Sequence, residues 1–264
     1  MSEASVSEAG GEGLAISRPR DGVVLAVIDR PPVNQLDRLA REAFLSLIES
    51  IEDDTAVRCL VVTGAGPQFC AGADLREERD LDPKDAGRFL GEFGRILSGL
   101  ATMRVPVIGA VNGGCLGGGL ELALQCDLLI ASQKAFFVAS GVNVGLVAST
   151  YALPRRIGVG PASSMLLTGE KCPADRALHF GLVNDVVEPD ALRDAALATA
   201  ERIASRAPLS VEATKRRLRA FGDESAEEAF LAGGREAVAL AKTRDHKEAL
   251  AAHFERRDGR FERR

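Results

Sequence analysis

The chain has 264 residues, of which 46% are hydrophobic and 27% are charged. This length and apolar content allow one substantial core, and a separate second domain is not expected. The formal net charge of −5 gives no basic footprint for nucleic acid, although pairs such as Arg216-Arg217 and Arg256-Arg257 occur.

The first residues, MSEASVSEAGGE, are acidic, small and polar, and they predict a disordered tail over 1–12. They have neither the apolar segment of a secretory signal nor the arginines of a mitochondrial one. No apolar run in the sequence reaches the eighteen or so residues of a membrane span. We therefore expect a soluble, cytoplasmic protein that contacts neither membrane nor nucleic acid.

The first regular elements are predicted from periodicity. Residues 14–17 and 23–28 flank an Asp-Gly turn and predict a β-hairpin, and residues 37–52 have the apolar spacing of an amphipathic helix. The apolar, β-branched run at 59–63 is typical of a buried parallel strand. The sequence Gly-Ala-Gly-Pro then breaks the chain, so a loop is expected over 64–82.

A second series of elements follows this loop. We predict a helix at about 84–102, a strand at 107–111, a helix that begins at three glycines, and a strand at 128–131. Strands that alternate with helices imply right-handed crossovers and a parallel sheet. The expected fold class is therefore α/β.

From about residue 188 the sequence predicts helices only. Residues 191–206, 210–221 and 225–254 are rich in Ala, Leu, Glu and Arg, with apolar residues at helical spacing. Such helices most often bury their apolar face in their own fold, so their periodicity does not indicate an oligomer.

The segment 113–132, GGCLGGGLELALQCDLLIAS, says most about chemistry. Gly117, Gly118 and Gly119 open an apolar helix that carries one carboxylate, Glu121. Glycine lets a ligand approach the backbone, and the first N–H groups of a helix lack internal partners and favour negative charge. Because residues three apart share a helix face, the spacing predicts an anion-binding N–H beside a proton-transfer group. That arrangement can form and protonate an enolate.

Other interpretations of this segment are open on the residues alone. A glycine-rich turn before a helix can serve tight packing, and Glu121 can complement the helix dipole or pair with a buried arginine. A P-loop is excluded because no Gly-Lys-Ser/Thr follows, and the glycines do not fit the dinucleotide-binding spacing.

A second motif lies upstream, where residues 69–75 read FCAGADL. Together with the pattern VNGxxxGGGxELAxxCD, it resembles the paired signature of the crotonase (enoyl-CoA hydratase/isomerase) superfamily, over roughly residues 13 to 261. The resemblance implies a ββα spiral core at 13–187 and a C-terminal helical subdomain at 188–264. It also implies that the backbone N–H groups of Ala73 and Gly118 form an oxyanion hole for an acyl-CoA thioester, with Glu121 as the catalytic acid-base.

One position departs from the family. The best-known hydratases carry a second glutamate, but Gly141 stands in its place here, and no carboxylate lies anywhere between residues 128 and 169. Two carboxylates can divide the work, because one holds a water while the other exchanges a proton. With one, Glu121 must do both, or a neutral group must orient the water. The expected substrate-pocket residues are Ser140, Gly141 and Asn143.

The resemblance also indicates contacts to coenzyme A. The expected contact residues are Ala71, Asp74, Leu75 and Arg76. Arg76 stands where the family often places a cation for the CoA phosphates, although a solvated surface arginine is the alternative. Asp74 is expected to cap the following turn. The stretch AHFERR at 252–257 is similar to a family pattern that can contact the adenine end, with His253 in place of the usual aromatic residue.

The remaining polar residues are expected to be structural. Asp127, which follows the glycine-led helix, is interpreted as a structural carboxylate, and the three histidines lie far along the chain from either motif. The five cysteines are an odd number without metal-ligand spacing. They predict reduced, buried thiols and no metal site.

The resemblance implies an acyl-CoA enzyme, in the first place a 2-enoyl-CoA hydratase or a related isomerase. No cofactor is implied beyond the CoA of the substrate, because the thioester itself carries the activating chemistry. Decarboxylation or thioester hydrolysis would use the same oxyanion hole. The glycine at position 141 also leaves open an acyl-CoA-binding protein of weak activity. The family further implies a homotrimer or a dimer of trimers.

Overall fold

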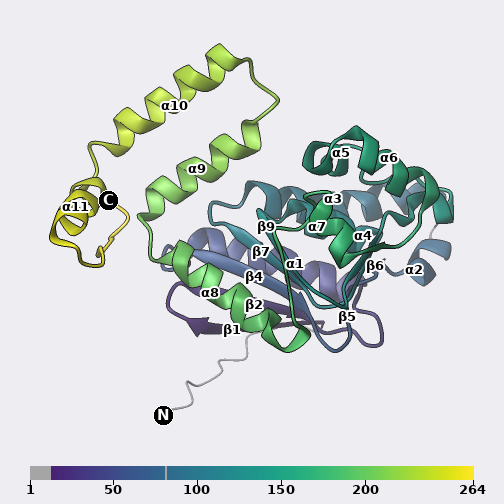
Figure 1. The fold of residues 1–264 in the computed structure, drawn as a ribbon. Helices are drawn as coiled ribbons and strands as arrows, with labels where there is room; N and C mark the ends of the chain where they lie inside the picture. Colours follow the sequence, from purple (N-terminus) through teal and green to yellow (C-terminus); the bar gives the residue numbers. More distant parts are fainter. Residues whose placement is uncertain (1–12, 81) are drawn as a thin grey trace, which may run out of the picture.

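The computed structural model describes residues 13–80 and 82–264. The tail expected over 1–12 lies outside these residues. In the described part, strands and helices alternate along the chain and form an α/β fold around a largely parallel sheet (Figure 1). The expected fold class is therefore confirmed.

A six-stranded sheet lies at the centre, with the strand order β1-β2-β4-β7-β9-β12. Its strands are β1 (Leu14–Arg20), β2 (Val23–Ile28), β4 (Cys59–Gly64), β7 (Val107–Val111), β9 (Leu128–Ser132) and β12 (Asp185–Val187). β1 and β2 form the expected antiparallel hairpin, and every later pair of neighbours is parallel. A parallel sheet needs cover on both faces, which is why its central strands are almost wholly apolar.

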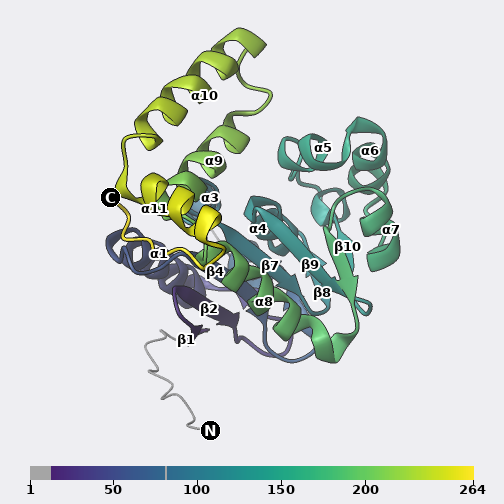
Figure 2. The same ribbon diagram turned by 60° about the vertical axis from the view of Figure 1, so that its left-hand side comes forward.

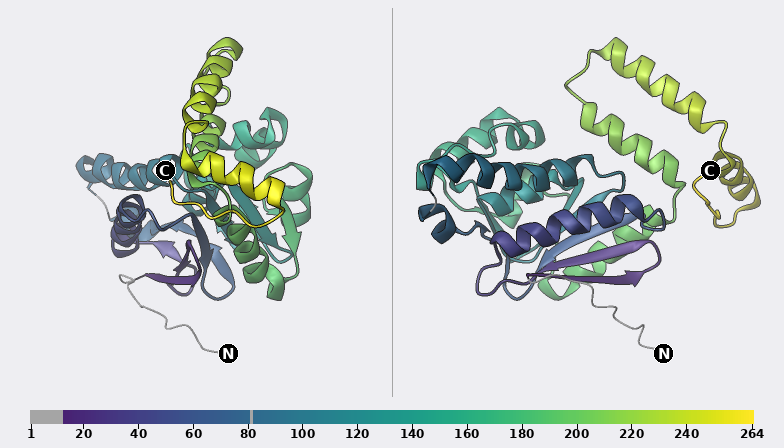
Figure 3. Two further views of the ribbon diagram at one scale, coloured as in Figure 1. Left: turned by 90° about the vertical axis from the view of Figure 1, so that its left-hand side faces the viewer. Right: turned by 180° about the vertical axis from the view of Figure 1, so that it is seen from behind.

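Alternate residues of the central strands enter two different cores. In β2, Val24 and Ala26 pack in a core that includes residues of α1 and α3. Their neighbours Val23 and Leu25 pack with α8 on the other face, as the two-residue period of a strand requires. These helices are α1 (Arg38–Asp53), α3 (Ala86–Thr102) and α8 (Leu192–Ala204). Figure 3 shows α1 and α3 across one side of the sheet, and Figure 1 shows α8 on the other, so α8 covers the core although it follows residue 188.

The stretch 64–82 is not a single loop, and that prediction was wrong. It contains β5 (Gln68–Cys70), β6 (Gly72–Ala73) and the short helix α2 (Leu75–Arg79). β5 lies parallel to β8 (Gly114–Leu116), and β6 lies parallel to β3 (Gln35–Leu36). Strands this short are defined by their partner strands rather than by a local pattern. The pairing of β5 with β8 brings the two sequence motifs together.

The second sheet has the order β11-β10-β8-β5, and most of its neighbouring helices lie between its strands in the chain. Its other strands are β10 (Phe136–Val138) and β11 (Cys172–Pro173). The helices around it are α4 (Gly118–Gln125), α5 (Ala152–Ile157), α6 (Val159–Thr168) and α7 (Ala174–His179). Three 3-10 turns join the larger elements: η1 (Pro83–Asp85), η2 (Ser140–Val144) and η3 (Pro189–Ala191).

The C-terminal helices form an extension of the core. They are α9 (Pro208–Ala220), α10 (Ala226–Leu240) and α11 (Arg244–Glu255). The single helix expected at 225–254 is therefore two helices. Thr243 separates them, because its side chain accepts the N–H of His246 and caps α11. α9 and α10 form a hairpin that projects from the sheet (Figure 2).

Buried carboxylates tie this extension to the core. Glu212 of α9 is 5% exposed and accepts hydrogen bonds from Arg104 at 3.2 Å and from Arg263 at 3.0 Å. Asp245 of α11 is 2% exposed and accepts the backbone N–H groups of Glu262 and Arg263. Buried charges need such partners, so Arg104 holds α9 on the core, and the last residues of the chain are fixed against α9 and α11.

All five cysteines are buried and unpaired, as expected. Burial raises the pKa of Cys59, Cys70 and Cys126 to about 12, so these thiols are not poised as nucleophiles. Among residues 13–80 and 82–264, no helix combines the length and the apolar character needed to cross a bilayer. The same residues include no group of three or more His, Cys, Asp or Glu side chains suited to a metal ion.

Candidate active site

Helix α4 begins directly after β8, at Gly118. Gly117 precedes it with a φ of +49°, a conformation that favours glycine, and its N–H donates to the Val138 carbonyl at 3.0 Å. The Gly117 carbonyl in turn accepts the N–H of Glu121 at 3.0 Å. As the first helical residue, Gly118 has an N–H without a partner in the helix, at the positive end of the helix dipole. This N–H is therefore suited to bind an anion.

The loop that contains β6 packs tightly on the start of α4. A Cβ added to Gly72 would lie 2.6 Å from the Gly118 nitrogen, and one added to Gly118 would lie 3.3 Å from the Ala73 nitrogen. A Cβ on Gly119 would lie 2.1 Å from the carbonyl oxygen of Cys70. Side chains at these glycines would push the two segments apart. Their absence brings the backbone of Ala73 beside that of Gly118.

Glu121 lies one turn into α4 and lines a cavity of about 300 Å³ between α4 and residues 147–152. Its Oε1 accepts the backbone N–H of Ser149 at 2.9 Å. Burial raises the pKa of Glu121, and the hydrogen bond from Ser149 opposes this in part. The contact of the Glu121 carboxylate among the described residues is thus a backbone N–H and not a buried arginine. A carboxylate in this setting is suited to proton transfer.

The three expected pocket residues belong to η2 and point in different directions. The Ser140 hydroxyl oxygen lies 2.7 Å from the position of a Cβ on Gly117, at the start of α4. A Cβ on Gly141 would lie 2.9 Å from the Leu146 carbonyl oxygen. Asn143 is exposed and donates its side-chain amide to the Gly169 carbonyl at 3.1 Å, beyond the end of α6. Asn143 is therefore not brought to Glu121, because its amide is held by a different loop.

The expected CoA-contact residues lie around the start of α2. Asp74 caps this helix, as expected, because its side chain accepts the N–H of Arg76 at 2.9 Å. Leu75 is 56% exposed and Arg76 is exposed, so both can reach a ligand at the surface. Ala71 is held by its N–H, which donates to the Val33 carbonyl at 3.1 Å. This segment thus offers an apolar and a cationic side chain two and three residues after Ala73.

The structure adds site residues that the sequence did not indicate. Ser149 follows Glu121 by 28 residues, in a stretch without periodicity or motif, yet it donates to the Glu121 carboxylate. Tyr151 lines the same cavity, and its hydroxyl donates to Asp223 at 3.1 Å. Arg155 pairs with the same Asp223 at 2.8 Å. The segment between α9 and α10 is therefore tied to one wall of the cavity.

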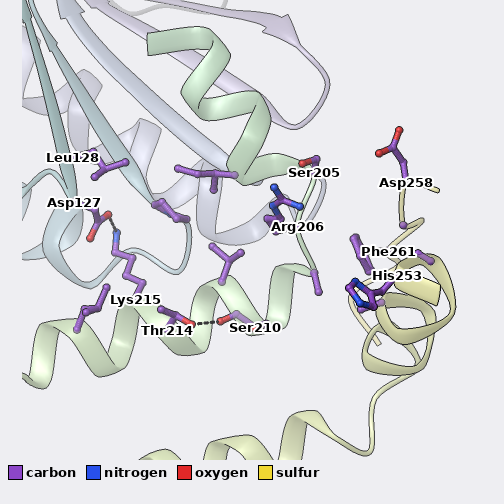
Figure 4. A pocket seen from close by; sticks show the side chains of 18 of the residues that line it. Asp127, Leu128, Ser205, Arg206, Ser210, Thr214, Lys215, His253, Asp258 and Phe261 are labelled. Atoms are coloured by element: carbon purple, nitrogen blue, oxygen red, sulfur yellow. Dashed lines mark hydrogen bonds and ion pairs between the residues drawn. The ribbon is translucent and has the colours of Figure 1, made fainter. Parts of the chain in front are cut away.

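A larger cavity, of about 730 Å³, lies between α9, α11 and the sheet (Figure 4). Asp127 and Lys215 meet at its wall at 2.9 Å, and Lys215 also donates to the Val105 carbonyl at 2.7 Å. Because Asp127 accepts the N–H of Val107 as well, it is a structural carboxylate, as expected. His253 also lines this cavity. The residues expected to act on a substrate do not, so this cavity is separate from that of Glu121.

Comparisons with known proteins agree with this arrangement. The sequence model of the enoyl-CoA hydratase/isomerase family matches residues 18–264. An (E)-benzylidenesuccinyl-CoA hydratase from Thauera aromatica is 40% identical over 244 residues, which are 90% of this chain and 95% of that protein. A short-chain-enoyl-CoA hydratase from Clostridium acetobutylicum is 36% identical over 252 residues, which cover 89% of this chain and 92% of that protein. The solved structure of an enoyl-CoA hydratase from Bacillus anthracis has a TM-score of 0.93 at 28% identity, over 96% of this chain and 100% of its own.

Proposed function

Since the chain belongs to the crotonase (enoyl-CoA hydratase/isomerase) family of acyl-CoA enzymes, we propose that it hydrates a 2-enoyl-CoA thioester. The observation that carries this proposal is the carboxylate of Glu121 in a cavity, one helical turn from Gly118 and its neighbour Ala73. Two relatives are named as hydratases, which supports hydration over other enolate chemistry. The reaction needs no cofactor beyond the CoA of the substrate, because the thioester activates the double bond.

In the proposed reaction, the N–H groups of Ala73 and Gly118 donate to the thioester oxygen. Water attacks Cβ, the electron pair of the C=C bond moves to Cα, and the thioester oxygen gains negative charge as an enolate. Preorganised donors favour this charged state over the neutral substrate, so they lower the barrier. The N-terminal position of Gly118 in α4 adds a favourable helix dipole.

Glu121 moves the proton in this proposal. Its carboxylate accepts a proton from the attacking water and returns it to Cα, so that water is added across the double bond and Glu121 is regenerated. One carboxylate can perform both transfers if they occur on the same face of the substrate. Because the hydrogen bond from Ser149 engages only Oε1, Oε2 is left for these transfers.

We assign the CoA part of the substrate to the segment after Ala73. Arg76 would pair with CoA phosphates, since a guanidinium forms strong charge-assisted hydrogen bonds with them. Leu75 and Ala71 would contact the apolar parts of the ligand, and Asp74 would hold α2 in place as its cap.

A second candidate reaction is isomerisation of the double bond between 3-enoyl- and 2-enoyl-CoA. It is favoured by Gly141, because moving a proton between Cα and Cγ needs one acid-base and no bound water. Glu121 is the one carboxylate among the described residues that line the cavity. The oxyanion donors would stabilise the same type of enolate.

The decisive experiment is a panel of acyl-CoA thioesters followed by absorbance and mass spectrometry. We expect crotonyl-CoA to lose its enoyl-thioester absorbance and to gain the mass of one water. Conversion of a 3-enoyl-CoA without any hydration would replace the proposal by isomerisation. Release of free CoA or of carbon dioxide would indicate thioester hydrolysis or decarboxylation, and binding without turnover would indicate an acyl-CoA-binding protein.

The hydration rate is expected to depend on pH through Glu121. Burial raises the pKa of this carboxyl above the ordinary glutamate value of 4.5, and catalysis needs the deprotonated form. The value of kcat/KM should therefore rise with pH and level off only above the raised pKa. A pH profile of crotonyl-CoA hydration measures this midpoint. A midpoint at or below the ordinary glutamate value would contradict the assigned base.

Restoring a second carboxylate is expected to help hydration. We predict that Gly141→Glu hydrates crotonyl-CoA faster than Gly141→Ala does. Both variants add a Cβ that must shift the backbone at Leu146, 2.9 Å away, but only one adds a carboxylate. Two nearby carboxylates separate their pKa values, so that one accepts and the other donates a proton. Steady-state rates of the two folded variants decide this, and equal rates would show that water activation does not limit the parent.

We also propose that the protein is a cytoplasmic homotrimer or dimer of trimers. Exposed apolar side chains on α10 support assembly, because Phe230 is 82% exposed and Val238 is 60% exposed. Apolar surface of this kind marks an interaction site. The buried, unpaired cysteines fit a reducing compartment. Light scattering after gel filtration measures the assembly, and a monomer at micromolar concentration would contradict it.

A further inference from the structure

Ser149 has a backbone conformation that serine rarely adopts. Its φ is +60°, in the left-handed region that favours glycine. The residue is 9% exposed, and its N–H donates to the Glu121 carboxylate at 2.9 Å. The backbone conformation aims this N–H at Glu121, but glycine would supply the same N–H without strain. Strain at a site residue therefore points to a use of the side chain.

The surroundings of Ser149 place this residue in the same cavity as Glu121. This cavity has a volume of about 300 Å³. Other polar side chains in its lining are engaged elsewhere, since Gln125 donates to the Glu121 carbonyl and Tyr151 donates to Asp223. Thr150 also lines the cavity but is exposed. Among the described residues, Ser149 is thus the polar neighbour held directly against the Glu121 carboxylate.

We propose that the Ser149 hydroxyl positions the water that attacks the substrate. This inference rests on the proposed hydration. The water would donate one O–H to Glu121 and the other to the Ser149 oxygen, which leaves a lone pair free to attack Cβ. The new C–O bond forms as the C=C bond opens, and Glu121 carries the released proton to Cα. Ser149 neither gains nor loses a proton, and it takes over the water-holding task that Gly141 cannot perform.

Ser149→Gly is the first test, because it keeps the N–H to Glu121, relieves the backbone and removes the hydroxymethyl side chain. We expect kcat for crotonyl-CoA hydration to fall at least about tenfold, with KM and thermal stability unchanged or improved. Ser149→Ala removes the same hydroxyl and should lose a similar factor. Thr102→Val, which removes the hydroxyl of an exposed threonine at the end of α3 and outside this cavity, is the control and should hydrate like the parent.

A second readout separates water positioning from a structural role. Exchange of the Cα proton of butyryl-CoA with deuterated solvent needs Glu121 and the oxyanion donors but no attacking water. We expect Ser149→Gly to retain this exchange within about twofold while hydration falls. Hydration at the parent rate in Ser149→Gly would overturn the inference, and so would a parallel loss of exchange. A parent that exchanges the Cα proton but hydrates no enoyl-CoA would instead overturn the proposed function, and this inference with it.

Discussion

Glu121→Gln is expected to lower turnover about a hundred- to ten-thousandfold while acyl-CoA binding survives. The amide keeps the shape of the side chain, and its oxygen can still accept the N–H of Ser149. It lacks a basic oxygen, however, so it cannot take a proton from water or return one to Cα. Incorporation of solvent deuterium at Cα measures this proton transfer directly.

Two controls separate lost chemistry from lost folding in this variant. Glu170→Gln makes the same Glu-to-Gln substitution at an exposed position and should leave turnover unchanged. Because the folded state raises the pKa of Glu121, the stability linked to this group is lost as pH rises through that pKa. Glu121→Gln should therefore be at least as stable as the parent at neutral pH. If Glu121→Gln exchanges deuterium as fast as the parent, another residue is the base.

Gly118→Pro is expected to reduce turnover by roughly a hundredfold or more relative to Gly118→Ala, on the scale of losing one oxyanion donor. Both variants add a Cβ, which would lie 2.6 Å from the tip of the Phe93 ring and must displace it. Only proline also removes the N–H. Proline is tolerated at the first position of a helix, where Gly118 lies, so the comparison isolates the donor.

The comparison of the two Gly118 variants is made on kcat/KM for the same thioester. Circular dichroism and thermal unfolding establish that both variants are folded. Equal activity in folded Gly118→Pro and Gly118→Ala would show that the N–H of Gly118 does not bind the thioester oxygen. A loss of activity relative to the parent that Gly118→Ala and Gly118→Pro share would reflect the contact with Phe93.

The large elements of the fold could be predicted because their patterns are local. The strand predicted at 107–111 is β7 with the same bounds, and the helix predicted at 37–52 is α1, shifted by one residue. Each contains enough consecutive residues of one periodicity to decide its type. The helix that begins at the glycines could also be predicted, because glycines and a long apolar run mark its start.

The short elements could not be predicted, because distant segments create them. β6 has two residues and exists only through its pairing with β3. The break before α11 depends on one capping side chain, that of Thr243, within a region whose helical periodicity continues on both sides. In both places the deciding interaction is a single contact rather than a pattern.

The residues of the candidate site also fall into those that the sequence could predict and those that it could not. The motifs placed Ala73, Gly118 and Glu121 close together, because their positions depend on backbone packing that the glycines encode. The contact between the Asn143 amide and the Gly169 carbonyl could not be predicted, since nothing in the sequence indicates it. Ser149 was missed because its contact with Glu121 depends on one positive φ angle, and a serine in the sequence does not indicate such an angle.

The tight fit of the glycines has a bearing on how this scaffold can evolve. A side chain at Gly72 or Gly119 would collide with the backbone of the other segment, whatever reaction the protein performs. Selection for folding alone is therefore enough to retain these glycines. Lineages that share the scaffold are free to exchange the other side chains that line the cavity of Glu121. In such proteins the glycines indicate common descent, whereas the polar side chains that face the substrate indicate which reaction is catalysed.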